Sequence, residues 1–292
     1  MTAATKTKGK LPTAGYDEIN SRLTRLLLYL IAFAVLALIA VPVAFAVLGG
    51  FRSMGQLSEN PVSLPNPWVF TNYADVLTLG TFWRQLANSA VIALLTTIVV
   101  LPAASLAAFV LSRYSFRGRE AIYTLFTFGL LFPVTVAIVP LFIVIRQINL
   151  LDTPLGVALP QAAFALPLSI VIMRPFFRSI PADLEEAASI DGCGPFRFYW
   201  SIMLPLSRPV LSTIAVIAIV TSWNAFLLPL VVLNNATSWT LPIGVTNFSS
   251  QYTTDTARVL AFTTLSMVPA LLFYLVAERQ IVSGLSSGAV KG

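Results

Sequence analysis

The chain has 292 residues, of which 57% are hydrophobic and only 10% are charged, whereas soluble domains carry about 25% charged residues. It has no histidine and one cysteine, Cys193, which excludes histidine-based acid–base chemistry, histidine metal ligation and an intramolecular disulfide. The net charge of +6 comes from short basic clusters beside apolar runs, which is the pattern of membrane topology and not of a nucleic-acid-binding face.

Six apolar runs are long enough to cross a bilayer, and in lipid they must be helices because every backbone polar group needs an internal partner. The predicted order is an N-terminal tail at 1–25, a first span at 26–50, an external segment at 51–86, a second span at 87–112, a third at 121–145, a fourth at 155–173, a charged loop at 174–208, a fifth span at 209–233, an external loop at 234–258, a sixth span at 259–277 and a C-terminal tail at 278–292. The expected fold is therefore an all-α polytopic membrane protein, with residues 87–277 as one transmembrane domain.

The first run could also be a signal peptide, with Ala44-Phe45-Ala46 as its cleavage site. Its apolar core is longer than the usual core of about 7–15 residues, which favours a membrane span. Every span also carries at least one proline, which indicates ordinary kinks or a set of bent helices around a pathway.

The uneven distribution of Lys and Arg predicts the orientation. Of the 18 basic residues, all but Arg52, Arg84, Arg146 and Arg258 lie in the two tails, the 113–119 turn and the 174–208 loop. We expect that side to be cytoplasmic, with both termini and the charged loop inside.

The six runs contain no ionisable side chain, so they offer no proton relay at membrane depth, although sodium coupling through backbone carbonyls stays open. The phosphate-binding pattern G-x-x-x-x-G-K-[ST] is also absent. No catalytic, cofactor-binding or metal-ligating residue is expected, and the chain is not predicted to be an enzyme. Energy for transport should enter from a partner at the cytoplasmic face.

The charged loop is where such a partner would bind. Asp183, Glu185 and Glu186 crowd the start of a predicted short helix, where the helix dipole favours negative charge, and Gly192 suits the position just past its end. A second short helix is predicted from Pro195 to Met203. From composition alone, an interfacial loop with an aromatic belt is an equally good interpretation.

The loop resembles the "EAA" signature of the permeases of ABC importers. The matching positions are Glu186, Ala187, Ala188, Asp191 and Gly192, followed by Ile202, Leu204 and Pro205. Cys193 stands where a small residue is usual in that family, and we expect it to be a tolerated small apolar side chain.

Further motifs resemble the carbohydrate-uptake branch of these permeases, and the maltose-type partner that ends in a short C-terminal tail. They are Asn72-Tyr73, Asn88-Ser89, Phe116-Arg117-Gly118-Arg119, Phe164-Ala165-Leu166-Pro167, Trp223-Asn224-Ala225-Phe226, Thr240-Leu241-Pro242-Ile243-Gly244 and the final stretch Gly284–Gly292. Ala225 stands where an acidic residue is common.

The resemblance implies a permease that moves a mono-, di- or oligosaccharide across a bacterial or archaeal cytoplasmic membrane by alternating access. Its implied partners are a second, related permease, an ABC ATPase homodimer that binds ATP and Mg, an extracytoplasmic sugar-binding protein, the sugar and membrane lipid, with no nucleic acid and no cofactor on this chain. The alternative is a sodium-coupled secondary transporter. A non-transporting scaffold or receptor is a third hypothesis.

The resemblance also implies site residues. Glu186, Ala187, Ala188, Asp191, Gly192, Leu204 and Pro205 would dock the ATPase, and Gly288, Val290, Lys291 and Gly292 would reach it from the tail. Apart from the resemblance, four polar or aromatic residues in or beside the spans are candidates for the translocation path, with helix–helix contact as the alternative role: Asn88, Gln161, Trp223 and Asn224.

Overall fold

The protein is described by a computed structural model that covers residues 22–249 and 254–289, with side chains described for 24–249 and 254–275. Within these ranges the regular structure is helical and no β-strand is present. Four helices are long and apolar enough to cross a membrane, and the number rises to six if each of two bent helix pairs counts as one span. The four are α1 (Arg22–Gly50), α4 (Gly80–Arg113), α7 (Pro154–Ser179) and α14 (Thr256–Ala289).

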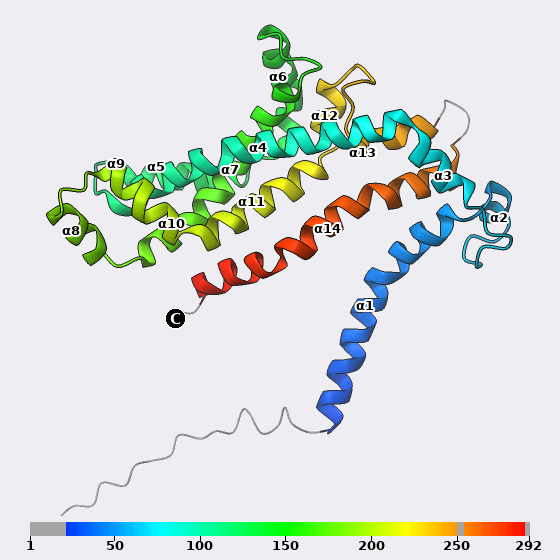
Figure 1. The fold of residues 1–292 in the computed structure, drawn as a ribbon, viewed down its shortest axis with the longest axis horizontal. Coiled ribbons are helices and arrows are strands. Elements are labelled where there is room, and N and C mark those ends of the chain that lie inside the picture. Colours follow the sequence, from blue (N-terminus) through cyan, green and yellow to red (C-terminus); the bar gives the residue numbers. More distant parts are fainter. Residues whose placement is uncertain (1–21, 250–253, 290–292) are drawn as a thin grey trace, which may run out of the picture.

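The long helices lie side by side in an elongated bundle (Figure 1). The central helix α4 packs along α7 and against α11 (Arg208–Trp223), and α11 in turn packs against α14. Helix α1 contacts α14 near one end and then diverges from the bundle, and its most apolar window has no buried residue. That exposed apolar surface requires lipid or a protein partner.

The sequence predicts one continuous third span at 121–145, whereas the structure divides it into α5 (Arg119–Gly129) and α6 (Val134–Gln147), bent by 98°. Pro133 begins the new direction, since it lacks an N–H and cannot continue the preceding helix. A side chain at Gly129 would meet the ring of Pro167 on α7, so the break fits closely against the neighbouring helix.

The fifth span, predicted at 209–233, is also interrupted. Helix α11 ends at Trp223, and α12 (Leu227–Val232) begins after three intervening residues. Pro229 lies in the first turn of α12, where a missing N–H costs nothing, and this favours a new helix over a continued one. The Asn224 side chain donates back to Val220 O at 2.8 Å and closes the end of α11.

The charged loop starts later than predicted. Helix α7 continues past Met173 to Ser179, so Arg174 is helical, and its side chain is only 4% exposed. Burial is tolerated because the guanidinium donates to Leu111 O at 3.0 Å, pairs with Glu120 and lies 3.9 Å from the ring centroid of Tyr123. The other long helices also extend beyond their predicted ends, and α14 continues to Ala289 through most of the predicted tail.

Short helices cap the end of the bundle opposite the charged loop (Figure 1). They are α2 (Met54–Glu59), α3 (Thr71–Thr78) and α13 (Leu241–Gly244). Asn72 joins this end to α1 by donating to Gly50 O and Arg52 O. The charged loop and the predicted external segments thus occupy opposite ends of the molecule.

Candidate functional site

The charged loop forms a helical elbow at the end of the bundle (Figure 1). Its first arm is α8 (Asp183–Ile190), with Asp183, Glu185 and Glu186 in the first turn, where they complement the helix dipole. Pro181 precedes this helix and does not form its first turn, because the helix begins at Asp183 with Ala182 as its N-cap.

The elbow turns at Gly192. Its φ of 75° lies in the left-handed region. Cys193 N donates to Ala188 O at 2.8 Å, and Gly192 N donates to Ser189 O at 3.0 Å, so the last carbonyls of α8 are satisfied in a Schellman motif. Glycine at this position therefore sets the angle between the two arms.

A Gly192→Ala variant should lower the stability of the elbow by about 1 kcal/mol, because alanine is strained at positive φ. Gly194→Ala is a matched control: both positions have open space for a Cβ, but Gly194 has a φ of −69°. The check is hydrogen exchange of the α8 amides, which should become faster in the first variant only. Equal exchange in the two variants would contradict this role for Gly192.

The second arm begins with α9 (Pro195–Phe198), continues as one π-helical turn (Tyr199–Met203) and ends in α10 (Leu204–Leu206). The predicted end at Met203 is thus one turn early, and Pro205 lies inside the last turn. The arm then bends by 77° into α11. Leu204 is half-buried, whereas Pro205 is exposed.

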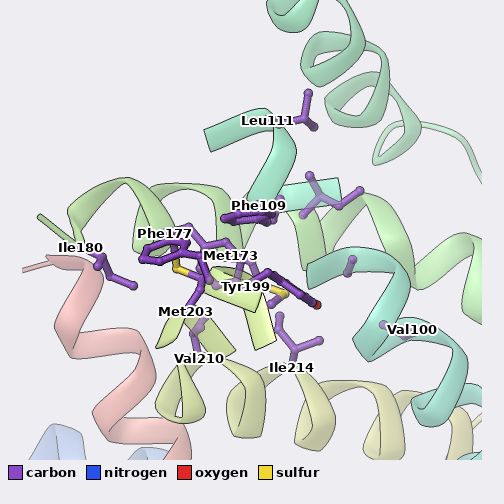
Figure 2. Packing of buried hydrophobic residues seen from close by; sticks show 14 of the residues in the cluster. Val100, Phe109, Leu111, Met173, Phe177, Ile180, Tyr199, Met203, Val210 and Ile214 are labelled. Atoms are coloured by element: carbon purple, nitrogen blue, oxygen red, sulfur yellow. The ribbon is translucent and has the colours of Figure 1, made fainter. Parts of the chain in front are cut away.

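The elbow is fixed to the bundle by an apolar cluster, which Figure 2 shows. Tyr199 and Met203 of the second arm pack with Phe109 of α4 and with Met173 and Phe177 of α7. The Tyr199 hydroxyl also lies 2.6 Å from Ser105 Oγ of α4. A movement of the elbow would therefore be transmitted to α4 and α7.

The two alanines of the signature have different environments. Ala188 is 7% exposed and belongs to the apolar cluster, so a larger side chain there would displace α8 from the bundle. Ala187 is exposed, together with Glu186 and Asp191. Ile190 is 87% exposed, an unusual state for a large apolar side chain at the end of a helix. The outer surface of α8 thus combines acidic and apolar groups.

Sequence reasoning missed the group that holds α8 against α4. The Arg113 guanidinium donates to Ile180 O at 2.8 Å and lies 3.8 Å from the Glu185 carboxylate. Burial, with a further contribution from Glu185, raises the pKa of the nearby Tyr114 hydroxyl. Among the described residues Glu185 has this ion pair, whereas Glu186 has none. Glu186 is therefore available for a partner, as are the exposed carboxylates of Asp183 and Asp191, which also have no ion pair among the described residues.

A second feature is a cavity of about 520 Å³ lined by α4, the start of α6, α7, α11 and α12. Gln161 lines it, and its Oε1 lies 2.6 Å from Ser222 Oγ and 3.1 Å from Thr96 Oγ1. Sequence reasoning selected Gln161 but not Thr96 or Ser222, because small hydroxyl residues are common in membrane helices for packing reasons.

The other candidate path residues do not gather around Gln161. Asn88 donates to Thr237 O and Trp239 O, which secures the external loop to α4. Trp223 Nε1 donates to Ser266 O at 3.4 Å, and Asn224 caps α11. None of the three lines the cavity of Gln161. In the tail, Gly288 lies in α14, whereas Val290, Lys291 and Gly292 lie outside the described residues.

Comparison with known proteins identifies one matching family and similar transport permeases. Residues 100–281 match the family of the "Binding-protein-dependent transport system inner membrane component". The diacetylchitobiose uptake system permease protein NgcG of Streptomyces coelicolor is 36% identical over 87% of this chain and 85% of its own length. The trehalose transport system permease protein SugB of Mycobacterium tuberculosis is 36% identical over 78% of this chain and 84% of its own length.

A solved structure supports the fold. A chain in the crystal structure of a bacterial ABC transporter involved in the import of the acidic polysaccharide alginate superposes with a TM-score of 0.75. The alignment covers 89% of this chain and 98% of the other, at 24% identity.

Proposed function

Because this chain belongs to the family of binding-protein-dependent transport system inner membrane components, we propose that it is a permease subunit of an ATP-driven sugar importer. It is a multi-pass integral membrane protein, and we place it in the cytoplasmic membrane of a bacterium or archaeon. Sugar as the cargo is supported by relatives that are named for diacetylchitobiose, trehalose and arabinooligosaccharides.

The observation that carries this proposal is the outer surface of α8. Glu186 and Ala187 are exposed and Ile190 is almost fully exposed, while Ala188, Tyr199 and Met203 of the elbow belong to the apolar cluster shared with α4 and α7. A partner that holds this surface can therefore move the bundle. In our proposal Glu186, Ala187, Ala188, Asp191, Gly192, Leu204 and Pro205 form or shape the docking surface for an ATPase, with Glu186 paired to a basic residue of that subunit. The tail residues from Gly288 to Gly292 reach the same subunit.

ATP and Mg would be bound by the ATPase dimer, and this chain itself would have no enzymatic activity. Closure of that dimer would bring the elbows of two permeases together and favour the outward-facing state. ATP can drive the change only by binding one state more tightly than the other.

We further propose six spans with both termini in the cytoplasm: the four long helices, the bent pair α5–α6, and α11, which follows the bend after the second arm of the elbow. The distribution of Lys and Arg supports this topology, and it places the elbow inside. A second, related permease and lipid would cover the exposed apolar surface of α1, and an extracytoplasmic binding protein would deliver the sugar to the end that carries α2, α3 and α13. Of the four candidate path residues we retain Gln161, because the polar groups of Asn88, Trp223 and Asn224 already contact backbone carbonyls.

The test is reconstitution of this chain with its second permease, ATPase and binding protein in liposomes. We expect uptake of a sugar such as trehalose or N,N′-diacetylchitobiose that requires ATP and is unchanged when the sodium gradient is removed. Uptake driven by a sodium gradient in the absence of the ATPase would show a secondary transporter instead. Insertion without transport, under conditions in which a related importer is active, would favour a scaffold or receptor.

A further inference from the structure

The cavity beside Gln161 has a mostly apolar, uncharged lining with a few polar groups. None of its described lining residues carries a charge, and large parts of its wall are the apolar side chains of Phe164, Leu168 and Phe226. Its polar groups include the hydroxyls of Thr96 and Ser222 and the Gln161 carboxamide. An apolar cavity with a few convergent polar groups is the usual form of a small-molecule site.

The Gln161 carboxamide is only half satisfied by the protein. Ser222 Oγ lies 2.6 Å from its oxygen and Thr96 Oγ1 lies 3.1 Å from it, although the Thr96 hydroxyl proton also has Ile92 O as an acceptor at 2.9 Å. The Gln161 Nε2 group is buried and has no hydrogen-bond partner among the described residues. A primary amide nitrogen carries two protons and has no acceptor capacity, so this site lacks an acceptor.

We propose that the cavity is a subsite for a neutral saccharide on this chain and that Gln161 donates a hydrogen bond to one oxygen atom of the saccharide. This inference rests on the proposed function. Hydroxyl, ring and acetamido oxygens of sugars all accept such a bond. The Ser222 hydroxyl donates to Oε1 and orients the amide, so a sugar oxygen that reaches the buried Nε2 meets an unused donor. The apolar walls contact the C–H faces of the sugar rings.

The same lining excludes acidic sugars. A carboxylate that enters loses its hydration, and no described lining residue supplies a compensating cation. The Gln161 amide offers a neutral donor, which is a weaker partner for an anion than a guanidinium or ammonium group. An oligosaccharide of uronic acids should therefore bind this cavity far more weakly than a neutral one.

The test follows the accessibility of a cysteine placed in the cavity wall of the complete transporter in nanodiscs. Cys193 is replaced by serine, and Ala225 becomes the reporter as Ala225→Cys. The measurement is the rate at which a small methanethiosulfonate reagent converts this thiol to a mixed disulfide, with release of methanesulfinate. The saccharide probes are trehalose, N,N′-diacetylchitobiose and digalacturonate. Ser115→Cys, in the exposed turn after α4, is the control cysteine.

We expect at least one neutral probe to slow disulfide formation at the Ala225→Cys thiol, with no effect of digalacturonate and no effect of any probe on the control cysteine. Gln161→Leu and Gln161→Glu should each raise the neutral sugar concentration that gives half-protection about tenfold or more, equivalent to about 1.4 kcal/mol. Both variants are included so that the role of Gln161 can still be tested if one variant fails to assemble with the other subunits.

Protection by digalacturonate that equals or exceeds protection by the neutral probes would overturn this inference, as would absence of protection by all three or full protection in both Gln161 variants. ATP-dependent uptake is measured in parallel after the same complexes are reconstituted in liposomes. Retained uptake without protection contradicts only the proposed subsite, whereas uptake that does not need ATP contradicts the importer function itself.

Discussion

Replacement of Glu186 by arginine should weaken binding of the ATPase subunit about 30-fold or more and reduce ATP-dependent uptake in proportion. The Glu186 carboxylate is exposed and has no ion-pair partner among the described residues, so it is free to pair across an interface. Reversal of its charge places two like charges at that interface, which costs several kcal/mol. Residues that anchor interfaces typically contribute at least about 2 kcal/mol each, which corresponds to the stated factor.

Affinity is measured by titration of the ATPase onto permeases held in nanodiscs. Glu59→Arg is the matched control, because Glu59 is also exposed and undergoes the same charge reversal in α2 at the opposite end of the molecule. Both variants should insert normally. If Glu186→Arg binds the ATPase as tightly as Glu59→Arg does, Glu186 has no part in docking.

Replacement of Arg174 by methionine should destabilise the end of the bundle that carries the charged loop by about 2–4 kcal/mol. The buried guanidinium donates to Leu111 O, pairs with Glu120 and stacks over Tyr123, thereby joining α4, α5 and α7. Methionine retains much of the side-chain volume but leaves a carbonyl without this donor, and an unsatisfied buried acceptor costs about 1–3 kcal/mol. Loss of the ion pair and of the cation–π contact accounts for the rest.

Arg178→Met provides the comparison. Arg178 also pairs with Glu120, at 3.2 Å, but its side chain is 45% exposed, and exposed pairs contribute about 0–1 kcal/mol. Thermal unfolding in detergent micelles should show a midpoint several degrees lower for the Arg174 variant and almost unchanged for the Arg178 variant. Similar midpoints in both variants would mean that the buried contacts of Arg174 do not stabilise the junction of α4, α5 and α7.

Much of the architecture follows from the sequence for a simple physical reason. In a bilayer an uninterrupted apolar run has few alternatives to a helix, so the long helices α1, α4, α7 and α14 cover the predicted runs. Local chemistry also predicts the turn at Gly192, because a helix end with positive φ favours glycine. The docking role of the surface beside that turn stays a prediction from resemblance.

The features that escaped prediction depend on contacts distant in sequence. Hydropathy does not distinguish a proline that a membrane helix tolerates from one that breaks it. The breaks before Pro133 and Pro229 depend on how the neighbouring helices pack against them. Arg113 and Arg174 follow the ends of apolar runs, where charged residues are expected in loops. Both guanidinium groups instead donate hydrogen bonds to backbone carbonyls of other segments and hold these segments together. The incomplete hydrogen bonding of Gln161 is visible only once α4, α7 and α11 are assembled.

In the proposed importer, the outer surface of α8 contacts the ATPase. A photoreactive benzoylphenylalanine at Ala187, an exposed position next to Glu186, measures this directly in the assembled transporter, with the same group at the exposed Gly80, at the start of α4, as the control. We predict a covalent adduct between position 187 and the ATPase subunit and no such adduct from position 80. An Ala187 probe that reacts only with lipid, or with the extracytoplasmic binding protein, would contradict the account.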